Sequence, residues 1–188
     1  SIRGENMDAI TMIKERRSVR KYKDEKVDRE TMREIVDIAR WAPSWVNYQI
    51  ARYTLVDDEE IIKEIAEHGV NGFVYNIDTL RTAKGVAVLS FVKGKSGTYD
   101  KEYITSKGNS WEVFDAGIAC QTFCLAAHAK GVGTCIMGVI DDKSIAKIVN
   151  LPEDETVAAL IVYGYEDGEH AAPNKRKDVD EIMRFVDR

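Results

Sequence analysis

Basic residues and a serine gather near the N-terminus in a pattern that suits an anionic ligand. The stretch 13–22 reads IKERRSVRKY, and within it Arg16 and Arg20 flank Ser18. Guanidinium groups can pair with phosphate oxygens through two parallel hydrogen bonds, and a hydroxyl adds a further donor. The pattern therefore predicts a site for a phosphate monoester. The alternative is a solvated helix end, because arginine near a helix C-terminus also interacts favourably with the helix dipole.

A second polar segment follows the next predicted helix. It reads APSWVN, and it places Pro43, Ser44 and Asn47 in a loop that offers side-chain and backbone hydrogen bonds. Aromatic residues lie on both sides of it and within it: Trp41, Trp45 and Tyr48. The combination favours a ligand-binding loop. A helix stop followed by an Asx turn accounts for it equally well.

The Gly-rich segment 131–138, GVGTCIMG, is not a Rossmann phosphate turn, because it follows a predicted helix and its glycine spacing is wrong. Its glycines would still let the backbone approach a flat ligand. Cys120 and Cys124 are four residues apart on one predicted helix, but no histidine supplies convincing further ligands. We interpret them as small core residues and predict no metal site. Cys135 lacks an identifiable base, which argues against a nucleophilic role.

Hydrophobic periodicity predicts the elements that position these groups. Predicted helices span about 8–16, 28–42, 59–69, 111–130 and 141–150, with a short one near the C-terminus. Predicted strands span 51–58, 85–92 and 156–165, and the last two are apolar runs typical of buried strands. Residues 93–110, rich in Gly, Ser and Lys, are expected to form a long mobile loop. Because helices and strands mix without regular βαβ spacing, we predict an α+β layered fold.

Length and composition limit the architecture and the partners. A chain of 188 residues, 44% of them hydrophobic, favours one domain at 8–188 after a disordered leader or cloning remnant at 1–7. A net charge of −5 argues against nucleic-acid binding. Three cysteines without a CxxC pair favour a reducing compartment, hence a cytoplasmic protein. No apolar run reaches membrane-spanning length, so no membrane partner is expected.

Four motifs in order resemble those of the nitroreductase family of flavoproteins. They are RRSVRKY at 16–22, APSWVNYQI at 42–50, GVGTCIMG at 131–138 and PNKRK at 173–177. Each motif alone is modest, but their order and spacing agree over about 8–185, nearly the whole chain. The resemblance implies a nitroreductase-like α+β fold, with a central, mainly antiparallel sheet surrounded by helices and with a long central helix.

The resemblance also implies a homodimer that holds FMN at the subunit interface. Basic residues and a serine from both ends of the chain would hold the phosphate and ribityl chain: Arg16, Arg17, Ser18, Arg20, Lys175 and Arg176. The loop of the other subunit would meet the flavin through Pro43, Ser44 and Asn47. The ring would lie beside Asn76 and the backbone of Ile136, Met137 and Gly138. The resemblance implies no metal ligand and no catalytic side chain.

Two positions depart from the family pattern. Ile50 stands where a proline usually follows Gln49. Thr79 stands where a lysine or arginine often lies near the pyrimidine edge of the flavin, and Arg81 and Lys84 follow closely in the sequence. A cation at that edge would favour anionic reduced flavin. Its displacement therefore bears on the redox potential more than on FMN binding.

The activity implied by the resemblance is that of an FMN-dependent NAD(P)H oxidoreductase. NADH or NADPH would pass a hydride to flavin N5 and leave, and a nitroaromatic, quinone or flavin-like acceptor would then take it in a ping-pong cycle. One alternative is a flavoenzyme of the same superfamily with other chemistry: dehalogenation, azoline oxidation or flavin breakdown. Another is a non-catalytic flavin-binding protein. A third is an α+β domain whose basic clusters are only surface.

Overall fold

A four-stranded sheet forms the centre of the computed structural model, which describes residues 8–188. The expected leader at 1–7 lies outside the described residues. The strands are β1 (Ala51–Val56), β2 (Gly85–Val92), β5 (Gly133–Met137) and β6 (Glu155–Gly164), in the order β1-β2-β6-β5. All neighbouring strands pair antiparallel, so the predicted α+β fold with a central antiparallel sheet is confirmed.

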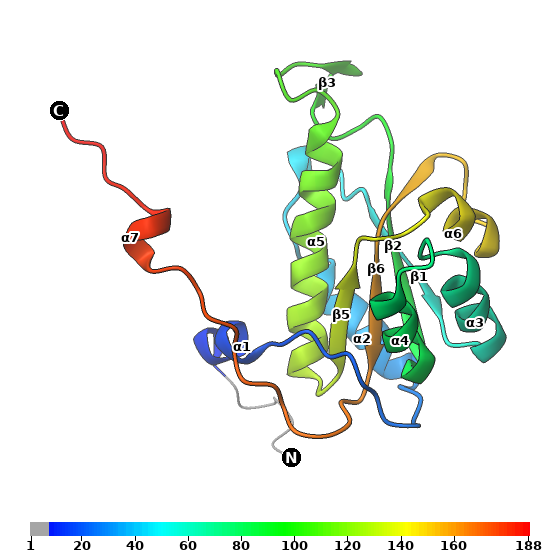
Figure 1. The fold of residues 1–188 in the computed structure, drawn as a ribbon. Helices are drawn as coiled ribbons and strands as arrows, with labels where there is room; N and C mark the ends of the chain where they lie inside the picture. Colours follow the sequence, from blue (N-terminus) through cyan, green and yellow to red (C-terminus); the bar gives the residue numbers. More distant parts are fainter. Residues whose placement is uncertain (1–7) are drawn as a thin grey trace.

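Helices cover both faces of this sheet (Figure 1). They are α1 (Ala9–Glu15), α2 (Arg29–Ala39), α3 (Glu59–His68), α4 (Val74–Thr82), α5 (Ser110–Ala129), α6 (Asp142–Ile148) and α7 (Val179–Ile182). The carboxylates of Asp8, Asp28 and Asp58 accept hydrogen bonds from first-turn amides, which fixes the starts of α1, α2 and α3 where the sequence predicts them. Among the described residues, no helix is both long and apolar enough to cross a bilayer.

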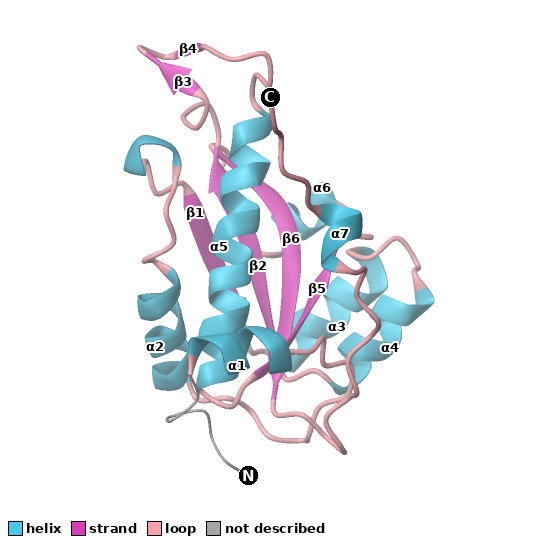
Figure 2. Ribbon diagram, turned by 90° about the vertical axis from the view of Figure 1, so that its left-hand side faces the viewer, coloured by secondary structure: helices cyan, strands magenta, loops and turns pink. Residues whose placement is uncertain are grey.

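Side chains alternate along β2 and divide the core into two halves. Ala87, Leu89 and Phe91 pack with α2 and the 20-residue α5 on one face of the sheet. Val86 and Val88 pack with α3, α4 and α6 on the other face. Figure 2 shows α2 and α5 on one side of the strands and α3 and α4 on the other. The apolar run of β2 is therefore a strand buried on both faces, as predicted.

Segment 93–110 is more ordered than its composition suggests. It forms a small hairpin from β3 (Thr98–Tyr99) and β4 (Glu102–Tyr103), and Ser96 within it is fully buried. The expected long loop therefore contains a hairpin that its composition does not reveal, because Gly, Ser and Lys also build tight turns when side chains from a neighbouring element hold them. The N-terminal part of α5 supplies those side chains. The mobility of the segment stays a prediction.

Two elements that carry site residues are not visible in the sequence pattern. Helix α4 has little amphipathic periodicity, so nothing distinguishes it from a loop. Strand β5 lies inside the Gly-rich segment, where glycines suggest a turn. Strand β5 forms one edge of the sheet, and α4 lines the same cleft beside it.

The C-terminal arm, defined here as residues 171–188, leaves the body of the chain. Figure 1 shows α7 standing away from the sheet and its helices. Large apolar side chains of the arm are exposed: Val179, Ile182, Met183, Phe185 and Val186. Soluble chains seldom leave so many large apolar side chains together in water, and such surface commonly marks a contact with another chain.

Candidate functional site

A cleft of about 640 Å³ opens at the β5 edge of the sheet. Its walls come from three stretches that are far apart in the sequence: the segment after α1, helix α4, and β5. From the predicted set it gathers Arg20, Asn76 and Ile136. Ligand sites commonly measure roughly 300–1,000 Å³. We call this the β5-edge cleft.

Backbone pairing holds the N-terminal basic segment against β5. Ser18 forms a parallel β-bridge with Thr134, and the amide of Val19 donates to the Thr134 carbonyl at 2.8 Å. Gly133 makes this approach possible, because a Cβ at that position would lie 2.8 Å from a methyl carbon of Val19. The first motif and the Gly-rich motif are thus one structural unit, and a glycine of the second makes room for the first.

The far wall of the cleft presents an oriented amide and an edge strand. Asn76 Nδ2 donates to the carbonyl of Val139 at 3.1 Å, which fixes the amide and leaves its oxygen available. The side chain of Ile136 is 48% exposed, whereas that of Met137 is buried in the core. Gly138 is exposed. Met137 can therefore present only its backbone to a ligand, as the resemblance implies for this stretch.

The three arginines of the first motif have different surroundings. Arg20 lines the β5-edge cleft. The Nε atom of Arg16 is buried and has no hydrogen-bond partner among the described residues. Arg17 donates to the carbonyls of Ala171 and Lys14, at 3.1 and 2.6 Å, and so ties the arm to the end of α1. A buried unpaired donor is costly, so Arg16 is the arginine that most needs an external acceptor.

The second basic cluster lies on the arm. Lys175 and Arg176 are exposed, and Arg176 donates to the carbonyl of Asn174 at 2.8 Å. In the described part of the chain, no contact joins either residue to Arg20. Their predicted phosphate contact stays a prediction.

A histidine pair anchors the start of the arm. A ring nitrogen of His170 lies 2.6 Å from the Glu15 carbonyl and the other lies 2.9 Å from the Glu166 carboxylate, and these contacts raise the pKa of His170. His128 of α5 stacks on it with ring centroids 6.2 Å apart. Burial, and then the neighbouring His170, lower the pKa of His128. The pair holds the arm beside α1 and α5.

A thiol lies in the cleft wall next to a cation. Burial raises the pKa of Cys135, and nearby Arg20 offsets this only in part. The thiol is therefore protonated near neutral pH, which argues against nucleophilic chemistry. Cys120 and Cys124 are buried in α5. Among residues 8–188, no three potential metal ligands come together.

The position that the resemblance aligns with a cation, Thr79, is neutral here. Thr79 is buried in the cleft wall, and its hydroxyl donates to the carbonyl of Tyr75 at 3.1 Å. Arg81 pairs with Asp78 at 3.4 Å, and Lys84 pairs with two carboxylates. Neither following cation replaces the missing charge. The positive charge of the cleft comes instead from the N-terminal basic segment.

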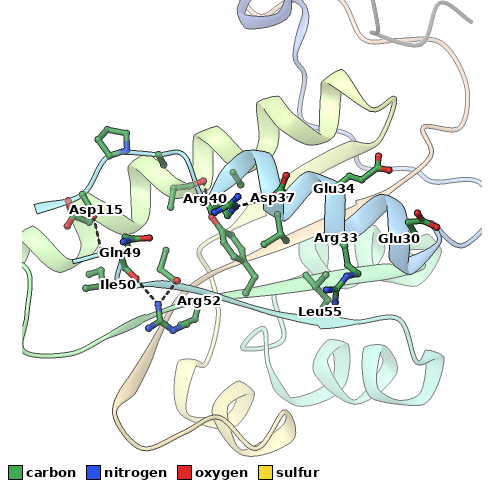
Figure 3. A pocket seen from close by; sticks show the side chains of 18 residues that line it. Glu30, Arg33, Glu34, Asp37, Arg40, Gln49, Ile50, Arg52, Leu55 and Asp115 are labelled. Carbon is green, nitrogen blue, oxygen red and sulfur yellow. Dashed lines mark hydrogen bonds and ion pairs between the residues drawn. The ribbon is translucent and has the colours of Figure 1, made fainter. Parts of the chain in front are cut away.

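Other members of the predicted set lie at the opposite edge of the sheet. Pro43 and Ser44 line a pocket of about 880 Å³ between α2 and β1, closed in part by Asp115 of α5. Figure 3 shows this pocket, with Arg52 donating to the Gln49 carbonyl at 2.7 Å. Because β1 and β5 are the two edges of the sheet, the predicted site is divided between them.

The loop that carries Pro43, Ser44 and Asn47 is backbone-strained. Val46, Asn47 and Gln49 have φ values of 48°, 54° and 54°, in the left-handed region that residues with a Cβ seldom adopt. For a β-branched residue such as Val46 this is a genuine outlier. Ser44 Oγ accepts from the amide of Gln49 at 2.9 Å and helps to hold the turn. Strained backbone of this kind tends to occur at functional sites.

Several residues of these two regions escaped the sequence reasoning. Lys21, Tyr75 and Thr82 line the β5-edge cleft, and their types are too common on surfaces to be singled out. Glu112 and Asp115 did carry a signal, because they are two acidic residues one turn apart in an otherwise apolar stretch of helix. A buried carboxylate needs hydrogen-bond partners, so that pattern predicts contacts with other segments.

Comparison with known proteins gives a consistent result. A sequence profile described as "Nitroreductase family" matches residues 13–165. A protein of Methanothermobacter thermautotrophicus, provisionally named NADH dehydrogenase/NAD(P)H nitroreductase, is 29% identical over 163 residues, which cover 85% of this chain and 78% of that protein. The iodotyrosine deiodinase of Thermotoga neapolitana is 25% identical over 163 residues, which cover 83% of this chain and 87% of that protein.

Solved structures share the fold. The FMN-dependent nitroreductase of Clostridium difficile superposes with a TM-score of 0.74 at 29% sequence identity. The match covers 94% of this chain and 98% of that one. The range matched by the family profile, 13–165, includes the segment after α1, α4 and β5, which together build the β5-edge cleft.

Proposed function

The chain belongs to the nitroreductase family, and from this premise we propose that it is an FMN-dependent oxidoreductase. It takes electrons from NADH or NADPH and passes them to a nitroaromatic, quinone or flavin-like acceptor. The observation that carries the proposal is the β5-edge cleft, where Arg20, Asn76 and Ile136 converge from three parts of the chain. Residues 8–188 would form a single FMN-binding domain.

The groups of the cleft and its surroundings fit FMN. A phosphate dianion needs guanidinium and hydroxyl donors, and Arg16, Ser18 and Arg20 supply them. Arg16 in particular brings a buried Nε that has no partner within the described residues. The free amide oxygen of Asn76 can accept from an imide N–H of the ring. The exposed edge of β5 near Ile136 offers backbone groups beside a flat ligand.

The protein contributes binding and orientation. When bound, FMN supplies hydride acceptance from NAD(P)H and hydride donation to the acceptor at N5. We propose a ping-pong order, in which the nicotinamide nucleotide leaves before the acceptor enters the same space. Cys135, the thiol of the cleft, is buried and protonated, so we assign no catalytic side chain. Thr79 leaves the wall next to the predicted pyrimidine edge neutral.

The division of the site between two sheet edges supports a homodimer. Arg20 and Asn76 line the cleft at the β5 edge, whereas Pro43 and Ser44 line the pocket at the β1 edge of the same chain. One ligand contacts both groups only if a second copy supplies one of them. The exposed apolar side chains of the arm also favour burial against a partner. Sedimentation should give twice the chain mass of 21.2 kDa, and a monomer that binds FMN fully would contradict this assembly.

An absorbance spectrum of the purified protein tests the proposed function. It is recorded before and after anaerobic addition of NADH and then of NADPH. Flavin bands that bleach support an FMN-dependent oxidoreductase. Bands that persist with both nucleotides would favour a non-catalytic flavin-binding protein. A colourless protein that takes up no FMN on incubation would contradict the proposal.

Dehalogenation is a second candidate, favoured by the similarity to the iodotyrosine deiodinase of Thermotoga neapolitana. Both chemistries would use the same FMN site and differ in the acceptor. Reduced protein is therefore offered a halogenated phenol and a nitroaromatic of similar size under anaerobic conditions. Release of halide at a rate exceeding that of nitro reduction would favour the second candidate.

A further inference from the structure

Two buried carboxylates of α5 reach different segments. Glu112 is 5% exposed and Asp115 is 4% exposed. Glu112 Oε1 accepts from the amide of Gly94 and from the hydroxyl of Tyr103, both at 2.9 Å. These contacts involve only segment 93–110. Among the described residues, Glu112 therefore holds only the hairpin segment to α5.

Asp115 joins that segment to the strained loop. Its Oδ2 atom accepts from Ser96 Oγ at 2.6 Å and from the backbone amide of Trp45 at 2.9 Å. The indole of Trp45 in turn donates to the carbonyl of Thr98 at 3.0 Å. One carboxylate oxygen thus links α5, the hairpin segment and the loop that precedes β1. Breaking these contacts would leave a buried carboxylate without hydrogen-bond donors, which is unfavourable. The three parts are therefore held together.

The loop needs such a restraint. Val46 directly follows Trp45, and its left-handed backbone stores strain that the surroundings must hold. Within the loop, the hydrogen bond from the Gln49 amide to Ser44 Oγ closes the turn, but it does not fix the loop to the rest of the fold. Asp115 and Thr98 supply the hydrogen bonds that do, and the ring of Trp45 also packs against Trp111 of α5 with ring centroids 5.2 Å apart.

We propose that Asp115 is a positioning residue that makes ordering of the flavin-facing loop and ordering of segment 93–110 a single event. The proposal rests on the proposed function in one respect, because it takes Pro43, Ser44 and Asn47 as the groups presented to FMN. Its consequence is that the covering segment and the FMN site are coupled. A change that loosens segment 93–110 through Asp115 also weakens FMN binding, whereas one that loosens it through Glu112 does not.

Hydrogen–deuterium exchange on the FMN-free protein tests the coupling without any flavin. Asp115→Ala should speed exchange in both 44–52 and 93–104. Glu112→Ala, the matched control on the same helix, should speed exchange only in 93–104. Asp115→Asn should protect both segments like the unaltered protein, because its amide oxygen can still accept both hydrogen bonds. Should Asp115→Ala fail to fold, Ser96→Ala takes its place. It removes one of the two donors to Asp115 and should speed exchange in both 93–104 and 44–52, whereas faster exchange confined to 93–104 would contradict the coupling.

FMN titration gives the second readout. Asp115→Ala should weaken FMN binding about tenfold, as expected for loss of a hydrogen bond to a charged group. Glu112→Ala and Asp115→Asn should leave FMN affinity unchanged. The proposal is overturned if Glu112→Ala exposes 44–52 as much as Asp115→Ala does, or if Asp115→Ala leaves 44–52 protected. If the unaltered protein binds no FMN, the proposed function fails, and the exchange result still decides whether Asp115 couples the two segments.

Discussion

The two edges of the sheet carry the two halves of the predicted FMN site, and they are built in different ways. At the β5 edge, regular backbone pairing places Ser18 beside Thr134, and Asn76 is fixed by Val139. At the β1 edge, the loop around Val46 is strained and depends on a buried carboxylate of α5. The half at the β5 edge is thus prepared by the sheet itself. The half at the β1 edge, which we propose meets the ring from a second copy, is held by contacts that a mutation can release separately.

The largest effect should come from removing two arginines that we propose bind the FMN phosphate, one in the β5-edge cleft and one on the arm. Arg20→Ala combined with Arg176→Ala should weaken FMN binding by roughly two to four decades, since each charge-assisted contact contributes about 1.5–3 kcal/mol. The fold should persist by circular dichroism. FMN affinity is measured by flavin fluorescence.

A matched double variant controls for net charge. Arg29→Ala with Arg184→Ala removes one arginine from the body and one from the arm, and it should leave FMN affinity nearly unchanged. Arg29 pairs with Asp57 on the surface, outside the residues that line the cleft. Equal losses in the two double variants would mean that the general field of the protein, and not a specific phosphate contact, governs binding.

Displacing the basic segment from β5 should have the next largest effect. In Gly133→Ala the new Cβ would meet Val19 at 2.8 Å, so the segment must move or the strand must bend. Overpacking of this kind typically costs about 1–3 kcal/mol. Urea unfolding should show that loss, together with weaker FMN binding. A loss of stability with unchanged FMN affinity would argue that the pairing with Thr134 does not position Arg20.

Relieving the strain at the β1 edge should stabilise the protein slightly. A left-handed conformation costs a residue with a Cβ about 1–2 kcal/mol, and Val46→Gly removes that cost. The greater freedom that glycine gives the unfolded chain offsets about 0.4–1 kcal/mol of the gain. The free energy of unfolding should therefore rise by about 0.5–1 kcal/mol. Val113→Gly is the control, because Val113 is similarly exposed but helical, and it should destabilise the protein. If both variants destabilise equally, the loop is not strained.

The smallest effect should be a pH dependence from the anchor of the arm. The folded-state pKa of His170 is raised above its ordinary value of 6.5, chiefly by the Glu15 carbonyl and also by Glu166. Its contribution to stability is therefore complete below pH 6.5 and is lost as the pH rises through the raised pKa. His128 has a lowered pKa, so it acts in the opposite sense and costs stability as the pH falls below 6.5.

Unfolding free energies measured across pH 5–9 isolate the contribution of His170 to stability. The stability difference between the unaltered protein and His170→Gln should shrink as the pH rises. A constant difference for His170→Gln would mean that the arm is held without protonation of this ring.

Sequence patterns predict the buried framework better than the site. Continuous apolar runs identify β2 and β6, and Asp28 and Asp58 mark the starts of their helices. The positions of α4 and β5 depend on tertiary contacts, because the first lacks periodicity and the second begins with a glycine, Gly133, whose role is close approach to Val19. Motifs identify the predicted site residues. They do not show that these residues lie at two opposite edges of the sheet, which follows from the strand order.

Contacts between segments far apart in the chain also limit how much of a residue's role can be predicted from the sequence around it. Asp115 touches residues 70 and 19 positions away in the chain, Trp45 and Ser96. A local pattern can show that a carboxylate lies in an apolar helix. It does not show which loops the carboxylate reaches, because that depends on how α5 lies across the sheet.

The bridge between Ser18 and Thr134 has a kinetic consequence. The basic segment leaves the ribosome early, but the strand that receives it is made more than a hundred residues later, and β5 itself needs β6 as its neighbour. Contacts of such sequence separation form late and slowly, since the intervening chain must first be closed into a loop. The proposed phosphate site should therefore be among the last parts of the molecule to assemble, and a nascent or truncated chain would expose its arginines before FMN could bind them.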